Sequence, residues 1–143
     1  MPSIGGGAPQ YQVEADQLEI QNKKGKAIFS GNVKIWNDTA EMRANRVEVF
    51  YVRGGDTIDY LEGYGNVQFD RGNMYGEGNY AYFDAQSDTI ILREDAYVRR
   101  GKNEFWADQI DVNIRTENVR MRKNVRGTLV QEFKKEPEEN GGN

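Results

Sequence analysis

The chain has 143 residues, of which 37% are hydrophobic and 29% are charged, and its net charge is −4. This length predicts one domain of modest size, and the low apolar content favours sheets with one dry face over a thick apolar core. The sequence contains neither cysteine nor histidine. That absence excludes disulfides, thiol nucleophiles, imidazole bases and the usual zinc ligands. We expect a protein that is not an enzyme and needs no cofactor.

The termini differ in character from the rest of the chain. Residues 1–9 include three consecutive glycines and are predicted to be a flexible lead, residues 10–133 to be the folded domain, and residues 134–143 to be a disordered polar tail. No run approaches the roughly 20 apolar residues of a membrane span. The chain also shows no charged segment followed by an apolar one at its start, so if the protein is exported, we expect its signal peptide to be absent from this sequence.

An internal repeat organises the folded part. Two columns of Asn or Asp recur at a step of 29 residues with a single step of 34 in each, and they consist of Asp16, Asn45, Asn79 and Asp108, and of Asn32, Asn66, Asp95 and Asn124. Both long steps contain the same five extra residues, 53–57, which we interpret as a lengthened hairpin tip. Repeats of this size are typical of stacked supersecondary units, none of which can bury its apolar face alone.

Within each repeat, apolar residues alternate with polar ones, and this period of two predicts half-buried β-strands. The first run covers residues 11–20, and its parity shifts by one at Ala15-Asp16. The returning run, residues 27–35, is broken at Gly31-Asn32. The other repeats behave alike, so each run is predicted to be two short strands joined at a bend. Turns are expected at residues 21–25, 37–38 and 70–73, and no helix is predicted.

The predicted fold class is all-β, an antiparallel twisted or V-shaped β-jellyroll built from four repeats of about 29 residues and open at both ends. The apolar columns should line the space between two facing sheets. They either close on each other as a sandwich core or line a cleft for acyl chains, and periodicity does not separate these alternatives. The candidate lining residues are Leu18, Ile20, Phe29, Val33, Ile35, Val47, Val49, Leu61, Val67, Phe69, Phe83, Leu92, Val98, Ile110, Val112 and Met121.

The first and last strands are predicted to have unpaired edges, around Tyr11 and Val13 and around Leu129 and Phe133. Such edges can add strands from a partner or from a second copy. Pairing between identical modules would be head-to-tail and need not close, so a filament-like homo-oligomer is one prediction.

Other motifs are weaker. Gly76-Glu77-Gly78-Asn79-Tyr80-Ala81 matches a dinucleotide loop in letters, but it falls inside a predicted strand. Glu94 and Asp95 are adjacent and should point to opposite faces, which does not suit a catalytic pair. Arg120, Arg122 and Arg126 share one parity and predict a cationic stripe on the outer face, for an acidic partner, for phosphates or simply for solvent. Nucleic-acid binding is not expected, because the chain as a whole is acidic.

A family resemblance rests on four segments: Ala-Asp-Gln-Leu-Glu-Ile at 15–20, Ser-Gly-Asn-Val-Lys-Ile at 30–35, Leu-Glu-Gly-Tyr-Gly-Asn-Val at 61–67 and Ala-Asp-Gln-Ile-Asp-Val at 107–112. With these segments the chain resembles the LptA/OstA family over about residues 10–133. The resemblance implies a periplasmic β-jellyroll that holds the acyl chains of lipopolysaccharide, at its lipid A part, in an apolar cleft. It also implies LptC-like and LptD-like jellyroll domains as partners, and the chain is itself similar to those domains.

Three hypotheses follow. The leading one is a lipopolysaccharide-binding bridge between the inner and outer membranes that pairs edge to edge with related domains. The second is a structural repeat scaffold, filled by its own side chains, without a lipid-carrier role. The third, a glycan-binding or enzymatic β-sandwich, would need convergent aromatic or carboxylate side chains, and Trp36 and Trp106 lie on different repeats.

Overall fold

The computed structural model describes residues 10–131, so Phe133, the lead at 1–9 and the tail at 134–143 lie outside the described residues. The described residues form ten β-strands and one short 3₁₀ helix. In chain order these are β1 (Gln12–Glu14), β2 (Gln17–Gln21), η1 (Asn22–Lys24), β3 (Lys26–Trp36), β4 (Glu41–Tyr51), β5 (Ile58–Arg71), β6 (Met74–Asp84), β7 (Thr89–Arg100), β8 (Asn103–Asn113), β9 (Val119–Arg122) and β10 (Arg126–Thr128).

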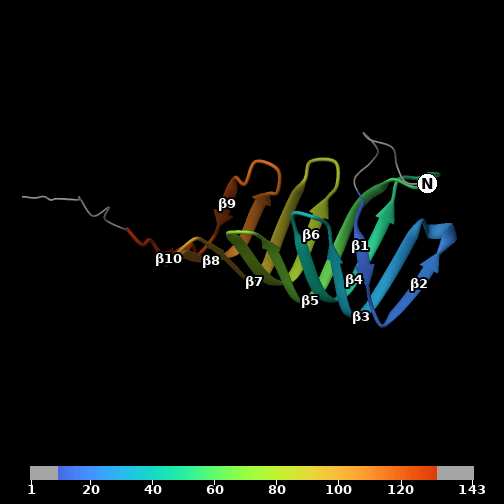
Figure 1. Ribbon diagram of the computed structural model, residues 1–143, viewed down its shortest axis with the longest axis horizontal. Helices are drawn as coiled ribbons and strands as arrows, with labels where there is room; N and C mark the ends of the chain where they lie inside the picture. Colours follow the sequence, from blue (N-terminus) through green and yellow to red (C-terminus); the bar gives the residue numbers. More distant parts are fainter. Residues whose placement is uncertain (1–9, 132–143) are drawn as a thin grey trace, which may run out of the picture.

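All ten strands belong to one antiparallel sheet rather than to two separate ones. Strands β3 to β8 follow one another in sequence order, β1 and β2 both pair with β3, and β9 and β10 both pair with β8 (Figure 1). Each strand therefore pairs mainly with its neighbours in the chain, which is the arrangement expected of a repeat. The predicted all-β class, antiparallel pairing and open ends are confirmed.

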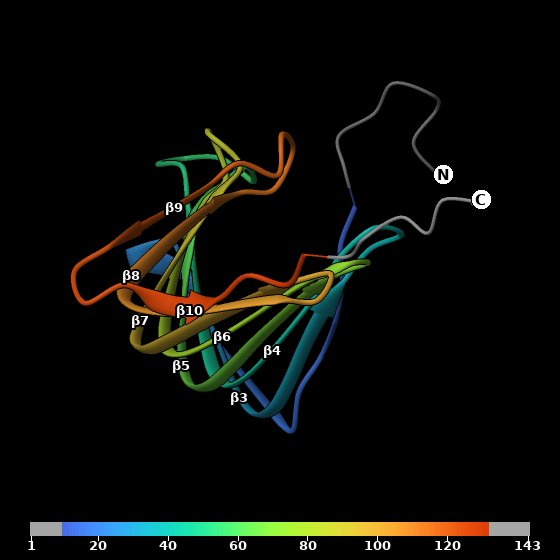
Figure 2. The ribbon, with the colours of Figure 1, turned by 90° about the vertical axis from the view of Figure 1, so that its left-hand side faces the viewer.

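The sheet bends back on itself along the line of the Asx columns. Register shifts fall between Ser30 and Val33 in β3 and recur at the matching place in the next strands. We call the half of the sheet that contains 17–21, 26–30, 46–51, 58–64, 80–84, 89–93, 109–113 and 119–122 arm A, and the half that contains 12–14, 33–36, 41–43, 67–71, 74–77, 96–100, 103–107 and 126–128 arm B. Seen along its long axis, the sheet is a twisted V (Figure 2).

The bends are bulges inside continuous strands, which corrects the prediction of two short strands per run. In β3, for example, Gly31 and Asn32 lie opposite the single residue Asn45 of β4. An extra residue bends a strand without ending it. Only the first and last runs are interrupted, between β1 and β2 and between β9 and β10, because each of these runs pairs with a neighbour on one side only.

The chemistry of the bend is local. The returning strands place two residues with positive φ at each bend, Gly31 and Asn32, Gly65 and Asn66, Glu94 and Asp95, and Lys123 and Asn124. Glycine and Asn tolerate this left-handed region best. A Cβ on Gly65 would lie 2.6 Å from Nδ2 of Asn45, so the bend is also too crowded there for a side chain.

The core lies between the arms on the inner face of the V. The hydrophobic cluster of buried side chains includes Val47, Leu92 and Ile110, which are each 0% exposed. Burying such side chains contributes roughly 1.5–3 kcal/mol each. The cluster follows the apolar columns of the repeat, so the predicted parity of the strands is confirmed.

The turns agree with their composition, with one addition. The extra residues 53–57 lie in the loop that joins β4 to β5, and Asn37 accepts hydrogen bonds from the backbone N–H groups of Thr39 and Ala40 at the β3–β4 turn. The segment 21–25, predicted to be a plain turn, contains the 3₁₀ helix, closed by Gly25 at φ +60°. Residues 10–131 contain no helix that is long and apolar enough to span a membrane.

Candidate functional site

The predicted lining residues all occupy inner-facing positions of their strands, but their exposure differs along the sheet. In the middle strands the side chains are covered by the protein itself, with exposures of 7% or less. This group comprises Val33, Val47, Val49, Leu61, Val67, Phe69, Leu92, Val98, Ile110 and Val112. The middle of the inner face is therefore filled by its own side chains.

Toward the two ends of the sheet and the free edges of the arms, the inner face is less completely covered. Phe29, Ile35, Phe83 and Met121 are half-buried and pack against the core. Leu18 and Ile20 on β2 are 54% and 68% exposed. The middle of the inner face is thus filled like a sandwich core, whereas its apolar side chains at the ends and along the free edges of the arms are partly or largely exposed.

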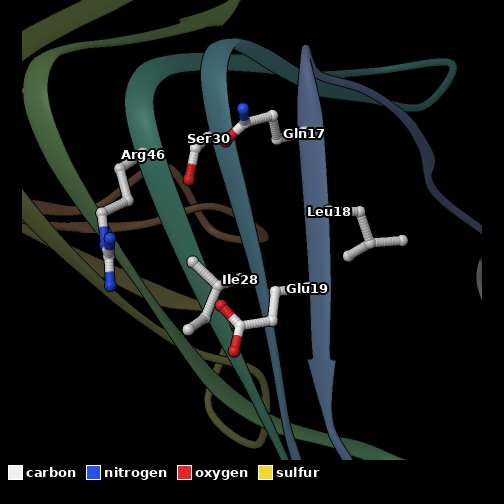
Figure 3. A pocket seen from close by; sticks show the side chains of 6 residues that line it. All are labelled: Gln17, Leu18, Glu19, Ile28, Ser30 and Arg46. Atoms are coloured by element: carbon white, nitrogen blue, oxygen red, sulfur yellow. The ribbon is translucent and has the colours of Figure 1, made fainter.

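At both ends of the sheet the outermost strands have one unpaired edge, and exposed apolar residues lie on or beside these strands. At the first end Tyr11 and Val13 are 46% and 42% exposed, and at the last end Val125 and Leu129 are 51% and 77% exposed. Leu129 follows β10 directly. A hollow borders the first edge on the outer face, lined by Gln17, Leu18, Glu19, Ile28, Ser30 and Arg46, and Leu18 points away from Gln17 and Glu19 to the other side of β2 (Figure 3).

The two ends have equivalent bends. At the first end Asn32 donates a hydrogen bond from Nδ2 to Oδ2 of Asp16 at 3.0 Å, and at the last end Asn124 donates one to Asp108 at 2.9 Å. The backbone hydrogen bonds at the two bends are also equivalent. The N–H of Asp16 donates to the carbonyl of Gly31, and the N–H of Asp108 donates to the carbonyl of Lys123. The backbone at the first edge is therefore built like the backbone at the last.

The outer face holds ion pairs and hydrogen bonds between polar side chains. Glu48 is 8% exposed and accepts from Lys26 at 2.8 Å and from Arg46 at 2.5 Å. Burial alone would raise the pKa of Glu48, but the hydrogen bonds from Lys26 and Arg46 outweigh it and lower that pKa. Burial and the hydrogen bond to Glu62 raise the pKa of Tyr64 to about 12.

The prediction that Arg120, Arg122 and Arg126 form one continuous cationic stripe is wrong. Arg120 and Arg122 lie on β9 in arm A, opposite Asp111 and Gln109, whereas Arg126 lies on β10 in arm B, opposite Trp106. All three keep the outer parity. The bend at residues 123–124 turns the chain between them, so the shared parity places them on two differently directed surfaces.

The remaining motifs occupy structural positions. Gly76 and Gly78 lie within β6, and a Cβ on Gly76 would meet Cδ1 of Leu92 at 2.8 Å. Glu94 and Asp95 form the left-handed bend of β7. These residues shape the sheet, and their positions give no reason to assign them a chemical role.

The sequence reasoning missed one charged cluster. Arg71 and Arg100, at the ends of β5 and β7 in arm B, form ion pairs with Glu117 in the β8–β9 turn of arm A, with N–O distances of 3.4 Å and 3.6 Å. Their shared repeat column was a signal that could have been found, since 71 and 100 are 29 residues apart. The crossing between arms depends on the twist of the sheet and was not readable from the sequence.

Comparison with known proteins gives a consistent family. The model of the family described as LptA/(LptD N-terminal domain) LPS transport protein matches residues 12–118. An uncharacterized protein of Rhizobium meliloti is 33% identical over 113 residues, which cover 73% of this chain and 61% of that protein. The lipopolysaccharide export system protein LptA of Escherichia coli K12 is 20% identical over 113 residues, covering 75% and 61%. This chain thus spans about 61% of the length of these relatives.

The fold agrees as well. The crystal structure of LptH from Pseudomonas aeruginosa, described as the LptA-homologous periplasmic component of the lipopolysaccharide transport device, superposes with a TM-score of 0.77 at 16% identity. The superposition covers 85% of this chain and 96% of that one. The chain belongs to the LptA/(LptD N-terminal domain) family of lipopolysaccharide transport proteins.

Proposed function

We propose that this protein is a periplasmic lipopolysaccharide carrier that forms one module of a bridge between the inner and outer membranes. The observation that carries the proposal is an apolar inner face that runs the length of the sheet and is most exposed at its first end, where Leu18 and Ile20 are 54% and 68% exposed, whereas Met121 at the last end is half-buried. An amphiphile's acyl chains gain about 0.8 kcal/mol for each methylene that they bury. Family membership favours lipopolysaccharide as that amphiphile.

The buried middle is compatible with lipid passage. The backbone hydrogen bonds run along each arm, between neighbouring strands, and the arms are joined covalently through the bends. A wider angle between the arms would therefore break side-chain contacts in the core without breaking the strand pairing. Acyl chains would replace contacts among Phe29, Phe83 and the core beneath them.

The edges support assembly with other jellyroll domains. Chain direction alternates from strand to strand, so the first run of a following module would lie antiparallel to β9 and β10. We propose that LptC-like and LptD-like domains, or further copies of this chain, pair with the two edges in this way. The equivalent bends at Asp16 and Asp108 support such a junction.

Photo-crosslinking tests the carrier proposal. A photoreactive amino acid at Ile20, Phe29 or Phe83 is expected to capture lipopolysaccharide, whereas the same residue at Lys34 or Glu77 on the outer face is not. Leu92 is unsuitable because it is 0% exposed, and Glu48 is a poor outward control because it is 8% exposed. Equal labelling of both faces would overturn the proposal.

Sedimentation over a range of concentrations tests the edge pairing. Ile20→Lys places a charge on the apolar side of the first edge and is expected to abolish association, whereas Glu19→Lys, on the outer side of the same strand, should preserve it. A wild-type chain that stays monomeric at high concentration would count against self-pairing. A scaffold without a carrier role, favoured by the filled middle of the inner face, predicts association without any lipid capture.

A further inference from the structure

Two arginines interrupt the apolar inner face where arm B ends. Arg71, Met74 and Arg100 form one cross-strand row, because Arg71 pairs with Met74 and Met74 with Arg100. Met74 is 0% exposed, so the row belongs to the inner parity. The two turns that follow these strands are tied together, since the N–H of Gly101 donates to the carbonyl of Asn73 at 3.1 Å. Arg71 and Arg100 therefore flank Met74 from the two strands on either side of β6, at the free edge of arm B.

Both arginines reach across to arm A. Arg71 donates from Nε to Oε2 of Glu117 at 3.4 Å, and Arg100 donates from Nη1 to the carbonyl oxygen of Glu117 at 3.2 Å. By contrast, the pairs Lys26–Glu48 and Arg122–Asp111 each join residues of the same arm. Arg71, Arg100 and Glu117, which we call the Glu117 cluster, thus connect the free edge of arm B to the free edge of arm A; we call these edges the two rims. An acyl chain that enters between the arms would pass next to this cluster.

The turn that carries Glu117 is fixed in shape. Oδ1 of Asn113 accepts from the N–H groups of Arg115 and Thr116, and the N–H of Glu117 donates to the carbonyl of Asn113 at 2.7 Å. The carboxylate is therefore presented to the arginines by a preformed loop.

Glu117 also occupies an unfavourable backbone position. Its φ is +64°, and at the repeat steps of 29 and 34 residues the same column contains Asp88, Gly54 and Gly25, all with positive φ. A glycine at this column would adopt the left-handed conformation without the cost that a side chain adds. The presence of a long acidic side chain where two other repeats of this chain have glycine supports a role for the carboxylate itself.

We propose that Arg71 and Arg100 bind the phosphate of an amphiphile whose acyl chains lie on the inner face, and that the Glu117 carboxylate occupies this site until the phosphate displaces it. The proposal rests on the carrier function proposed above. Guanidinium groups bind phosphate through paired, charge-assisted hydrogen bonds, and a phosphate offers more acceptor oxygens and more charge than one carboxylate. Displacement of Glu117 would also remove the ion pairs that join the two rims.

Binding of paired lipids to the full chain tests the site. The probes are bisphosphorylated lipid A and the same lipid after enzymatic removal of both phosphates, with inorganic phosphate alone as a third probe. The double variant Arg71→Gln/Arg100→Gln should lose about tenfold or more in affinity for the phosphorylated lipid and keep its affinity for the dephosphorylated one. The double variant Arg99→Gln/Arg126→Gln is the control, because it removes the same charge from the outer face.

The Glu117→Gln variant tests the displacement. Removing the competing charge should raise the affinity for the phosphorylated lipid several-fold and leave that for the dephosphorylated lipid unchanged. The chain has no cysteine, so spin labels at Asn73→Cys and Asn118→Cys can report the separation of the rims. That separation should increase when phosphorylated lipid is added, and inorganic phosphate at the same concentration should not increase it.

The outcomes separate the two proposals. If both lipids bind and the inner and outer arginine variants behave alike, the phosphate site is wrong and the carrier function stands. If neither lipid binds, the carrier function fails and the phosphate site fails with it. Circular dichroism of every variant, showing an unchanged sheet, ensures that a loss of affinity reports the site and not unfolding.

Discussion

The middle of this sheet and its two ends are built from the same repeat, yet they differ in how completely their inner side chains are covered. Leu92 on β7 and Leu18 on β2 belong to one cross-strand row that runs through β3, β4, β5 and β6. Leu92 is 0% exposed, whereas Leu18 is 54% exposed. The difference lies in the neighbours, because β7 has a strand on each side and β2 pairs with β3 only.

An end of the sheet has the same inner residues as the middle but lacks a neighbouring strand on one side. A repeat that stacks in one dimension buries its apolar face only where another repeat follows. At the ends the same apolar residues stay in contact with solvent and with whatever binds there. This physical difference assigns stability to the middle strands, and it is the reason why we propose partner binding at the end strands.

Leucine truncation gives the largest expected contrast. Leu92→Ala should lower the free energy of unfolding by about 3–4 kcal/mol, because it leaves a cavity in a packed core. Leu18→Ala, in the same row, should cost less than about 1 kcal/mol, as is usual for exposed positions. Urea denaturation followed by circular dichroism measures both. Similar losses at the two sites would mean that the middle is not packed more tightly than the ends.

Replacing a bend glycine with alanine should also destabilise the protein more in the middle of the sheet than at its end, with a smaller difference between the two sites. Gly65→Ala in β5 forces a side chain into φ +81° and against Asn45, and we expect a loss of about 2 kcal/mol or more. Gly31→Ala meets Asp16 at 2.5 Å, but Asp16 lies in the chain between β1 and β2, which can move away. Thermal unfolding should therefore rank Gly65→Ala as the more destabilising change, and the reverse order would contradict this account.

Removing an ion pair should also cost more stability in the middle of the sheet than at its end. In the middle, the contribution of the ion pair should depend on pH. Glu48→Gln should cost about 1–2 kcal/mol at pH 7, whereas Arg122→Gln at the last end should cost less than about 1 kcal/mol because that arginine is exposed. The pKa of Glu48 is below its ordinary value of 4.5 in the folded state, so its contribution is fully present above that value and is lost as pH falls through the folded pKa. Urea midpoints at pH 7 and pH 3 should therefore differ less in Glu48→Gln than in the wild type.

The smallest expected effect is a gain. Glu94 in β7 has φ +64° in the column where β3 and β5 have Gly31 and Gly65. Glu94→Gly should raise the free energy of unfolding by up to about 1 kcal/mol, because relief of the left-handed strain exceeds the entropy cost of glycine. Lys123→Gly, at the equivalent position of the last run, should gain less. A destabilised Glu94→Gly variant would show that the Glu94 side chain contributes contacts that outweigh its strain.

Much of the fold was readable from the chain because it depends on local rules. Alternation determines which face a strand residue occupies, and the Asx columns mark the bends, so Val47 and Ile110 were placed correctly. The cationic stripe failed because Arg120 and Arg126 lie on either side of such a bend, and parity alone does not give the direction in which a surface faces. The continuity of the strands was also missed, since a bulge and a break have the same sequence pattern.

The sequence by itself determined the strands, their inner and outer faces, the line of bends and the open edges, because each of these depends on residues close together in the chain or at a fixed repeat step. Only the tertiary structure decided that the inner face is filled in the middle and less completely covered at the ends, since coverage depends on how many strands flank a residue and how far the arms splay. It alone brought Glu117 to Arg71 across 46 positions of sequence. Contacts between the arms depend on the accumulated twist of all the strands, which no single repeat encodes.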